Sequence, residues 1–360
     1  MSERGAEGEA DHPEVPAGAG ISTRRSAPRP ISGWRIVRSV LSRIGSALLV
    51  VWITATIVFV ALRASGDPLE AIMGGPGSQA SADAVARATA AYGLDQPILL
   101  QYFAQLWRIA TLQFGDSYAR KQPVMELLTE NVPPTVLLAT LALLLAWILA
   151  VASTLIAATS RGRIVGVIRA VLSAIDTVAS VIPQFFLGAV LILVFATGLG
   201  VLPATSAASN PASLILPVVT LAVPIAGYLA HILQGSLAEV DAAPFATTAR
   251  SRGASESRVF LVHTLRHAAL PAIALSGWAY GSLLSGAVVV ESLFARQGLG
   301  RLLLEAATVR DIPVVIGAVT VIALLYVAIM LLASLAEAIV DPRHAEPIPS
   351  TPAPLEAVGS

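Results

Sequence analysis

Long stretches without a charged residue dominate this chain and restrict what it can fold into. Residues 44–62, 177–238 and 267–290 contain no Asp, Glu, Lys or Arg. A helix needs about 20 mainly apolar residues to cross a bilayer. Charged residues make up 13% of the chain and hydrophobic residues 55%, whereas soluble domains carry roughly twice that charged fraction. The sequence therefore predicts an all-α polytopic membrane protein.

Six transmembrane helices are predicted from the charge-free intervals. The interval 177–238 is long enough for two helices, because the Gly-, Pro- and Ser-rich stretch 198–213 divides it. The predicted spans are residues 44–62, 131–160, 177–195, 214–234, 267–290 and 312–336. Pro183 should bend the third span, and His231 lies late in the fourth. The sequence leaves open whether these two residues line a translocation pathway or serve helix packing and the membrane interface.

The distribution of arginine predicts the orientation. Arginines precede the first predicted span, follow the second and fill the loop between the fourth and fifth: Arg35, Arg38, Arg43, Arg161, Arg163, Arg169, Arg250, Arg252, Arg258 and Arg266. Such an excess is typical of cytoplasmic loops, so both termini are expected in the cytoplasm. The acidic segment 66–131 is expected outside, with helices at 81–92 and 97–110. Residues 1–32 and 344–360 are predicted to be disordered tails around one membrane domain, 33–343.

The loop 239–271 is the most polar part of the second half of the chain. Pro244 suits the first turn of a short helix, on which Phe245 and Ala249 share one face. Arg250 and Arg252 lie off that face, and Gly253 suits the end of the helix. A second helix is predicted from residue 258 to 269. A helix with an apolar stripe and a basic rim is typical of a segment that docks into a groove on another protein.

Several motifs in the chain resemble one family of bacterial membrane proteins. They are Glu239 followed by ARSRG at 249–253, YGLDQP at 92–97, GAVVVESLF at 286–294, GLGR at 298–301 and RDIPVV at 310–315. This pattern is similar to that of ABC importer permeases of the dipeptide, oligopeptide and nickel type, B-subunit class. The loop 239–271 resembles the coupling loop of that family, although Ala243 and Pro244 replace its usual acidic pair.

The resemblance implies a type I importer permease fold and a place in the bacterial cytoplasmic membrane. It implies import of dipeptides or oligopeptides by ATP-driven alternating access. The implied partners are a second homologous permease, two ABC ATPase subunits, an extracytoplasmic substrate-binding protein and the lipid bilayer; no nucleic acid is expected. The implied ATPase-coupling residues are Glu239, Phe245, Ala249, Arg250, Arg252 and Gly253.

Other functions stay open at this stage, and some chemistry is excluded. A nickel chelate or another small solute could be the cargo, and a stand-alone secondary transporter or a receptor is the alternative class. The chain has no cysteine, and Arg120 precedes its only lysine, Lys121, so it lacks a phosphate-binding P-loop. His263 and His267 have no evident third metal ligand, and Asp176 is expected to face water or to be capped. We therefore predict no catalytic residue, metal or cofactor.

Overall fold

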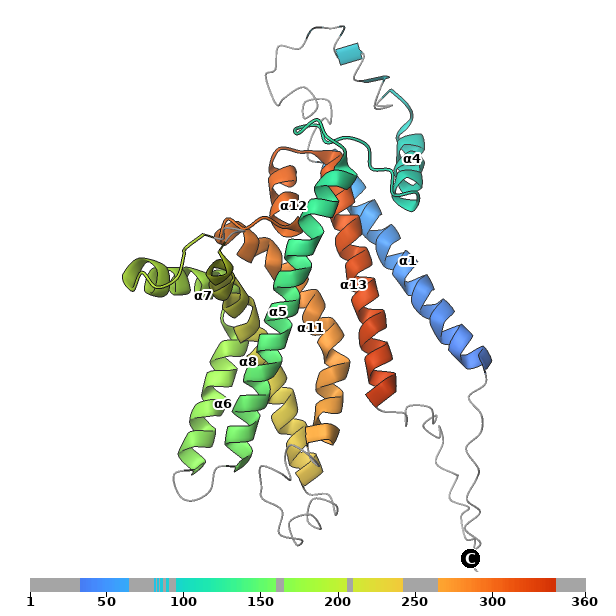
Figure 1. Ribbon diagram of the computed structural model, residues 1–360. Helices are drawn as coiled ribbons and strands as arrows, with labels where there is room; N and C mark the ends of the chain where they lie inside the picture. Colours follow the sequence, from blue (N-terminus) through green and yellow to red (C-terminus); the bar gives the residue numbers. More distant parts are fainter. Residues whose placement is uncertain are drawn as a thin grey trace, which may run out of the picture. The chain divides into compact units, whose positions relative to one another are not determined.

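The computed structural model describes most of the central chain. The described residues are 33–64, single positions between 81 and 90, 95–159, 165–205, 210–241 and 265–340. The chain divides into two units, Met1–Val40 and Leu41–Ser360, and the helix packing lies within the second. The described residues form helices joined by loops, with one isolated β-bridge between Asp116 and Pro123 (Figure 1).

Four helices are long and apolar enough to cross a membrane by themselves. They are α5 (Val124–Thr159), α8 (Ile215–Asp241), α11 (Leu265–Leu293) and α13 (Ile312–Val340). A fifth candidate is a pair of helices bent by 107°, in which α6 (Val165–Val181) leads into α7 (Gln184–Leu191) and the π-helical segment Ile192–Gly198. In α1 (Gly33–Ala64) the described side chains include the shorter apolar stretch Leu48–Ala61. The described residues thus contain four or five candidate spans, against the six predicted.

Two expectations about span boundaries need correction. The second span was expected to begin near residue 131, but α5 begins at Val124 and contains Pro133 and Pro134. The prolines are tolerated because the carbonyls that they leave unbonded belong to Thr129 and Glu130, which are exposed. The third span was expected to be one bent helix, but the chain forms two helices separated at Ile182 and Pro183.

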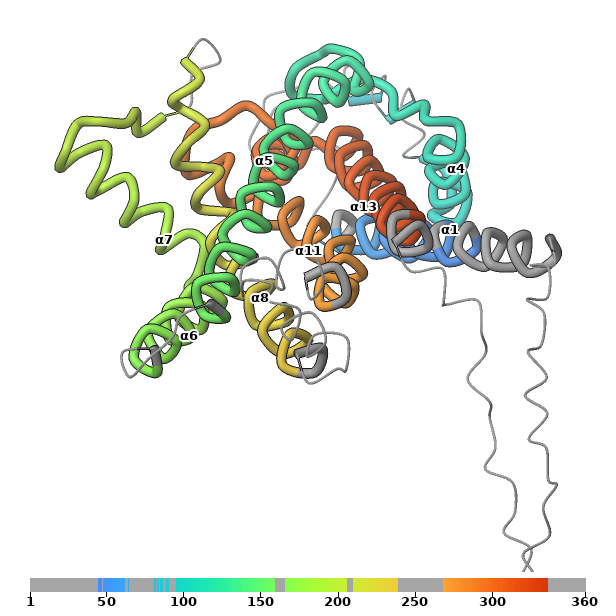
Figure 2. Tube along the Cα trace, turned by 60° about the horizontal axis from the view of Figure 1, so that its bottom comes forward, coloured from blue at the N-terminus to red at the C-terminus, as the bar shows by residue number. Residues whose placement is uncertain are grey.

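The main core lies where α5, α8 and α11 meet. Leu221, Leu229 and Leu233 of α8 have no exposed surface. Helix α8 packs against α5, α6 and α11, and α11 also packs against α13 (Figure 2). Gly277 and Gly281 of α11 face Met330 and Tyr326 of α13 without room for a side chain. The small residues of α11 therefore permit close helix approach.

A second core lies at the end of the bundle where α5 begins, α11 ends and α13 begins. We call this the α12 end, after the short helix α12 (Leu299–Thr308) that joins α11 to α13 (Figure 1). This core combines residues from five helices, including Ala55 of α1 and Ile109 of α4 (Ile98–Ala110). Helix α4 matches the predicted helix 97–110, while the predicted helix 81–92 is described only at single positions.

Candidate functional site

A buried carboxylate joins three helices at the α12 end. Glu291 of α11 has no exposed surface. It accepts hydrogen bonds from the Thr135 hydroxyl of α5 and from the backbone N–H groups of Gly300 (2.8 Å) and Arg301 (3.1 Å). The Thr135 hydroxyl in turn accepts a bond from the Leu299 N–H at 2.8 Å. These bonds satisfy the first backbone donors of α12, which a helix cannot satisfy internally, and so attach α12 to α5 and α11.

The backbone around Glu291 is packed too closely for additional side-chain atoms. A Cβ at Gly298 would overlap the Glu291 carboxylate, and one at Gly300 would lie 2.5 Å from the Val288 Cα. Burial lowers the pKa of the nearby Arg296 guanidinium, and the negative charge of Glu291 partly offsets this effect. The Arg296 Nε is buried and has no hydrogen-bond partner among the described residues. The negative charge of Glu291 therefore favours the charged form of this partly buried guanidinium.

A second buried carboxylate attaches the loop before α5 to the start of α13. Asp311 accepts hydrogen bonds from the Ser117 hydroxyl (2.5 Å) and from the N–H groups of Tyr118 and Ala119 (3.1 Å each). The Ser117 oxygen also accepts a bond from the Arg120 N–H at 2.9 Å. The loop between α4 and α5 thus follows a path set by one carboxylate, in the same way that Glu291 positions the start of α12.

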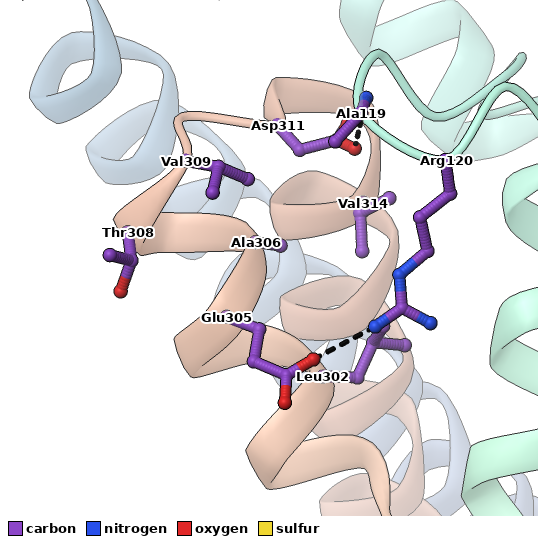
Figure 3. A pocket seen from close by; sticks show the side chains of 9 residues that line it. All are labelled: Ala119, Arg120, Leu302, Glu305, Ala306, Thr308, Val309, Asp311 and Val314. Carbon is purple, nitrogen blue, oxygen red and sulfur yellow. Dashed lines mark hydrogen bonds and ion pairs between the residues drawn. The ribbon is translucent and has the colours of Figure 1, made fainter.

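A cavity of about 370 Å³ opens beside this loop (Figure 3). Its lining comes from the loop, α12 and the start of α13: Ala119, Arg120, Leu302, Glu305, Ala306, Thr308, Val309, Asp311 and Val314. Glu305 bonds Arg120 at 2.8 Å and Arg301 at 2.7 Å. Nearly half of the Arg120 and Glu305 side chains is exposed, so this ion pair contributes little stability. The charged groups of the cavity are therefore already paired, and its other walls are mostly apolar.

A third buried carboxylate lies between α5, α6 and α8. Asp176 accepts bonds from the Ser153 hydroxyl at 2.8 Å and the Gln234 amide at 2.9 Å. It is 7% exposed, so of the two expected alternatives the water-facing one is wrong, and the carboxylate is instead held by hydrogen-bond donors. Beside it, the Thr177 hydroxyl lies 3.3 Å from the His231 Nε2. Hydrogen bonds from side chains therefore hold α6 to its two neighbours.

The bent helix pair turns at Pro183. This residue has extended backbone angles and precedes the first turn of α7, where its missing N–H leaves no bond unmade. Glycines allow α7 to approach its neighbours: Gly188 faces Leu293 and Thr220, and the Gln184 side chain occupies the space in front of Gly286. The proline was expected to bend a helix; the structure confirms a bend, of 107°, and shows that it separates two helices.

Comparisons with known proteins now identify the family. The family model described as "Binding-protein-dependent transport system inner membrane component" matches residues 150–346. The chain belongs to this family. A Brucella suis protein named "Putative peptide transport system permease protein" is 33% identical over 314 residues, covering 84% of this chain and 98% of its own length. The glutathione transport system permease protein GsiC of Salmonella choleraesuis is 32% identical over 307 residues, covering 84% of this chain and 97% of its own.

Solved structures also resemble the chain. An inward-facing structure of the MetNI methionine ABC transporter aligns with a TM-score of 0.49 at 18% identity, over 60% of this chain and 97% of that one. The relatives are permease subunits of transport systems, and this permease is a multi-pass membrane protein by its apolar helices. Among the described residues, no group of three His, Cys, Asp or Glu could hold a metal ion.

The predicted coupling residues of this permease lie mostly outside the described residues. The coupling residues outside the described part of the chain are Phe245, Ala249, Arg250, Arg252 and Gly253. His263 also lies outside it. The backbone of Glu239 belongs to the last turn of α8. The two helices that flank the predicted loop, α8 and α11, pack directly against each other. Of the two predicted pathway residues, Pro183 lies at the helix break, and His231 is half-buried opposite α6.

Sequence reasoning assigned no role to the carboxylates that organise the α12 end. Glu291 and Asp311 belong to motifs that carried the family resemblance, but their contacts come from Thr135 and Ser117, which are 156 and 194 positions away in the chain. One signal was present: Glu291 is a single acidic residue directly after a long charge-free run. A carboxylate at the end of a long apolar helix needs hydrogen-bond donors in place of the water that it loses.

Proposed function

We propose that this chain is one of two homologous permease subunits of an ABC importer that moves dipeptides or oligopeptides. The observation that carries the proposal is the likeness to named peptide and glutathione permeases over 97–98% of their length. Glutathione is itself a tripeptide, so both names describe cargo of one chemical class. Transport would proceed by ATP-driven alternating access, with two ATPase subunits and an extracytoplasmic binding protein as partners.

The proposed topology has six spans with both termini in the cytoplasm. Its spans are α1, α5, the α6–α7 pair, α8, α11 and α13. The connections 160–164 and 242–264 follow the ends of α5 and α8 opposite the α12 end. These connections contain arginines, which supports a cytoplasmic location for that end of the bundle. The α12 end and the segment 66–131 would then face outward, where the binding protein would dock.

The loop 239–271 would couple ATP hydrolysis to movement of the spans. Its proposed docking surface is Phe245, Ala249, Arg250 and Arg252, with Gly253 as the turn and Glu239 at the end of α8. Direct packing of α8 on α11 supports this role, because a displacement of the loop would be transmitted to both helices together. Because the chain has no P-loop, the ATPase activity would belong to the partner subunits.

The break at Pro183 and the side chain of His231 are the proposed pathway positions. A helix break at membrane depth is tolerated where protein or a water-filled cavity surrounds the freed backbone. The adjoining π-helical segment supports this proposal, because π-helical turns are often found at functional sites. His231 offers one of the few ionisable groups in the apolar helices, next to Thr177 of α6.

Reconstitution into proteoliposomes tests the proposal. The chain is co-purified with a second permease and the ATPase subunits, and uptake of a labelled dipeptide by the vesicles is measured with ATP supplied on the side of the ATPases. We expect ATP-dependent uptake that requires the binding protein. Gly253→Val should abolish uptake while the chain stays in the membrane. The matched control is Gly166→Val, at a glycine with open space around it. Uptake without ATPases would instead establish a secondary transporter.

A further inference from the structure

Helix α4 carries an apolar stripe that no part of the described chain covers. Leu99, Leu100, Phe103 and Trp107 follow the spacing of one helix face. All four are exposed, Phe103 to 62% and Trp107 to 69%. A cluster of large exposed apolar side chains on one face marks a contact with a partner or a membrane, whereas isolated ones need no explanation.

The other sides of α4 either pack against the protein or are polar. The Tyr102 hydroxyl is hydrogen-bonded to that of Thr56 in α1 at 2.7 Å, and its ring meets Phe59 edge-on with centroids 5.4 Å apart. Ile109 is buried in the second core. Gln101, Gln105 and Arg108 form a third, polar side. One side of α4 is thus anchored to the rest of the protein. The exposed apolar stripe occupies a second side, and the polar residues occupy a third.

The position of α4 along the bundle identifies what covers the stripe. Ile109 belongs to the same core as Val124 and Val314, which lie in the first turns of the membrane-spanning helices α5 and α13. Helix α4 is therefore level with the ends of these candidate spans, where the boundary between hydrocarbon and headgroups is expected. Tryptophan beside arginine on an amphipathic helix is typical of this boundary, where the aromatic ring enters the lipid and the cation stays at the headgroups.

We propose that α4 is an interfacial helix whose stripe of Leu99, Leu100, Phe103 and Trp107 is inserted into the lipid bilayer. Helix α1 also exposes large apolar side chains near the anchor, because Trp52, Ile53 and Ile57 lie within four positions of Thr56. The segment before α5 is then held by lipid as well as by Asp311. This inference needs only a membrane-spanning chain and does not depend on the cargo or on the direction of transport.

Single-cysteine spin labelling tests the proposal in the assembled importer. The chain contains no cysteine, so each variant carries one label. Leu100→Cys, Phe103→Cys and Trp107→Cys report on the stripe, and Gln101→Cys, Gln105→Cys and Arg108→Cys are matched controls on the polar side. Leu106→Cys, on the packed side, supplies a reference for protein contact. In nanodiscs, collision of each label is measured with oxygen, which concentrates in lipid, and with chromium oxalate, which stays in water.

We expect the ratio of oxygen to chromium oxalate accessibility to peak at positions 100, 103 and 107 and to fall at 101, 105 and 108. The ratio should follow a helical period of about 3.6 residues. Low accessibility to both reagents at the stripe, as at Leu106, would show that a protein subunit covers it and would overturn the proposal. High chromium oxalate accessibility would show water and would also overturn it. A sample that shows no peptide uptake but keeps this accessibility peak would contradict the proposed cargo. It would not contradict the insertion of α4 into lipid.

Discussion

The buried carboxylates of the α12 end differ from the one between α5, α6 and α8 in the donors that they bind. Glu291 and Asp311 each accept two backbone N–H groups and one hydroxyl. Asp176 accepts only side-chain donors, from Ser153 and Gln234. A side chain that loses its partner can rotate toward another, but a backbone N–H cannot. Contacts with backbone N–H groups therefore determine the path of the chain, whereas contacts with side chains only hold neighbouring helices together.

The largest loss of stability is expected for Glu291→Ala. This change leaves the N–H groups of Gly300 and Arg301 without acceptors and removes the charge that compensates Arg296. Each unsatisfied buried donor costs about 1–3 kcal/mol, so the free energy of unfolding should fall by about 4 kcal/mol. Denaturant titration in micelles measures it. Glu291→Gln keeps the shape and one acceptor oxygen and should lose less. Equal losses for both variants would contradict the backbone-donor explanation.

Asp311→Ala should have a slightly smaller effect. It removes the acceptor for Tyr118 and Ala119, but the loop lies beside an open cavity where water can reach these groups. We expect a loss of about 3 kcal/mol in the free energy of unfolding. The loop should also become susceptible to limited proteolysis while the spans stay folded. Ser117→Ala removes the hydroxyl donor to Asp311 and the acceptor of the Arg120 N–H, but it keeps both backbone bonds to Asp311. It is the control and should leave the loop protected.

Helix contact in the α6–α8 region can be tested at two glycines of α8. A Cβ at Gly227 would meet the Asp176 carbonyl oxygen and lie 2.8 Å from the Ser180 nitrogen, whereas Gly235 has open space. Gly227→Ala should push α6 away and cost about 2 kcal/mol. Gly235→Ala should be neutral or stabilising, because alanine favours a helix by about 1 kcal/mol over glycine. Similar melting temperatures for the two variants would show that α6 is free to move away.

Asp176→Asn tests a carboxylate that accepts its hydrogen bonds from side-chain donors. The amide keeps one oxygen that can accept from Ser153 or Gln234, and both donors can reorient. The expected loss in the free energy of unfolding is about 1 kcal/mol. A loss as large as that of Asp311→Ala would remove the distinction between the two regions. Ser153→Ala should reproduce part of the effect, and the double variant should be less than additive.

The smallest effect is expected at the exposed ion pair of the α12 end. Arg120→Ala removes a bond to Glu305, but both side chains are nearly half exposed. Surface pairs contribute about 0–1 kcal/mol, so the change in melting temperature should be small and should shrink further at high salt. A large, salt-independent loss would mean that the pair is buried by a partner in the assembled importer.

Much of the fold follows from the sequence because hydrocarbon admits few alternatives. Charge-free runs of about 20 residues predicted the helices α5, α8, α11 and α13. The family was also evident in short motifs such as GAVVVESLF at 286–294. The predicted coupling residues, including Phe245 and Gly253, stay a prediction because they lie outside the described residues.

Local pattern determined the long apolar helices of this protein and the family it belongs to, because hydrophobic run length and motif spacing are properties of neighbouring residues. Only the tertiary structure decided that the chain turns by 107° at Pro183, since a proline shows that a helix is interrupted but not where the chain goes next. It also decided what Glu291 and Asp311 do. Their donors come from other helices and loops, and a hydrogen bond between distant segments leaves no periodicity in the sequence.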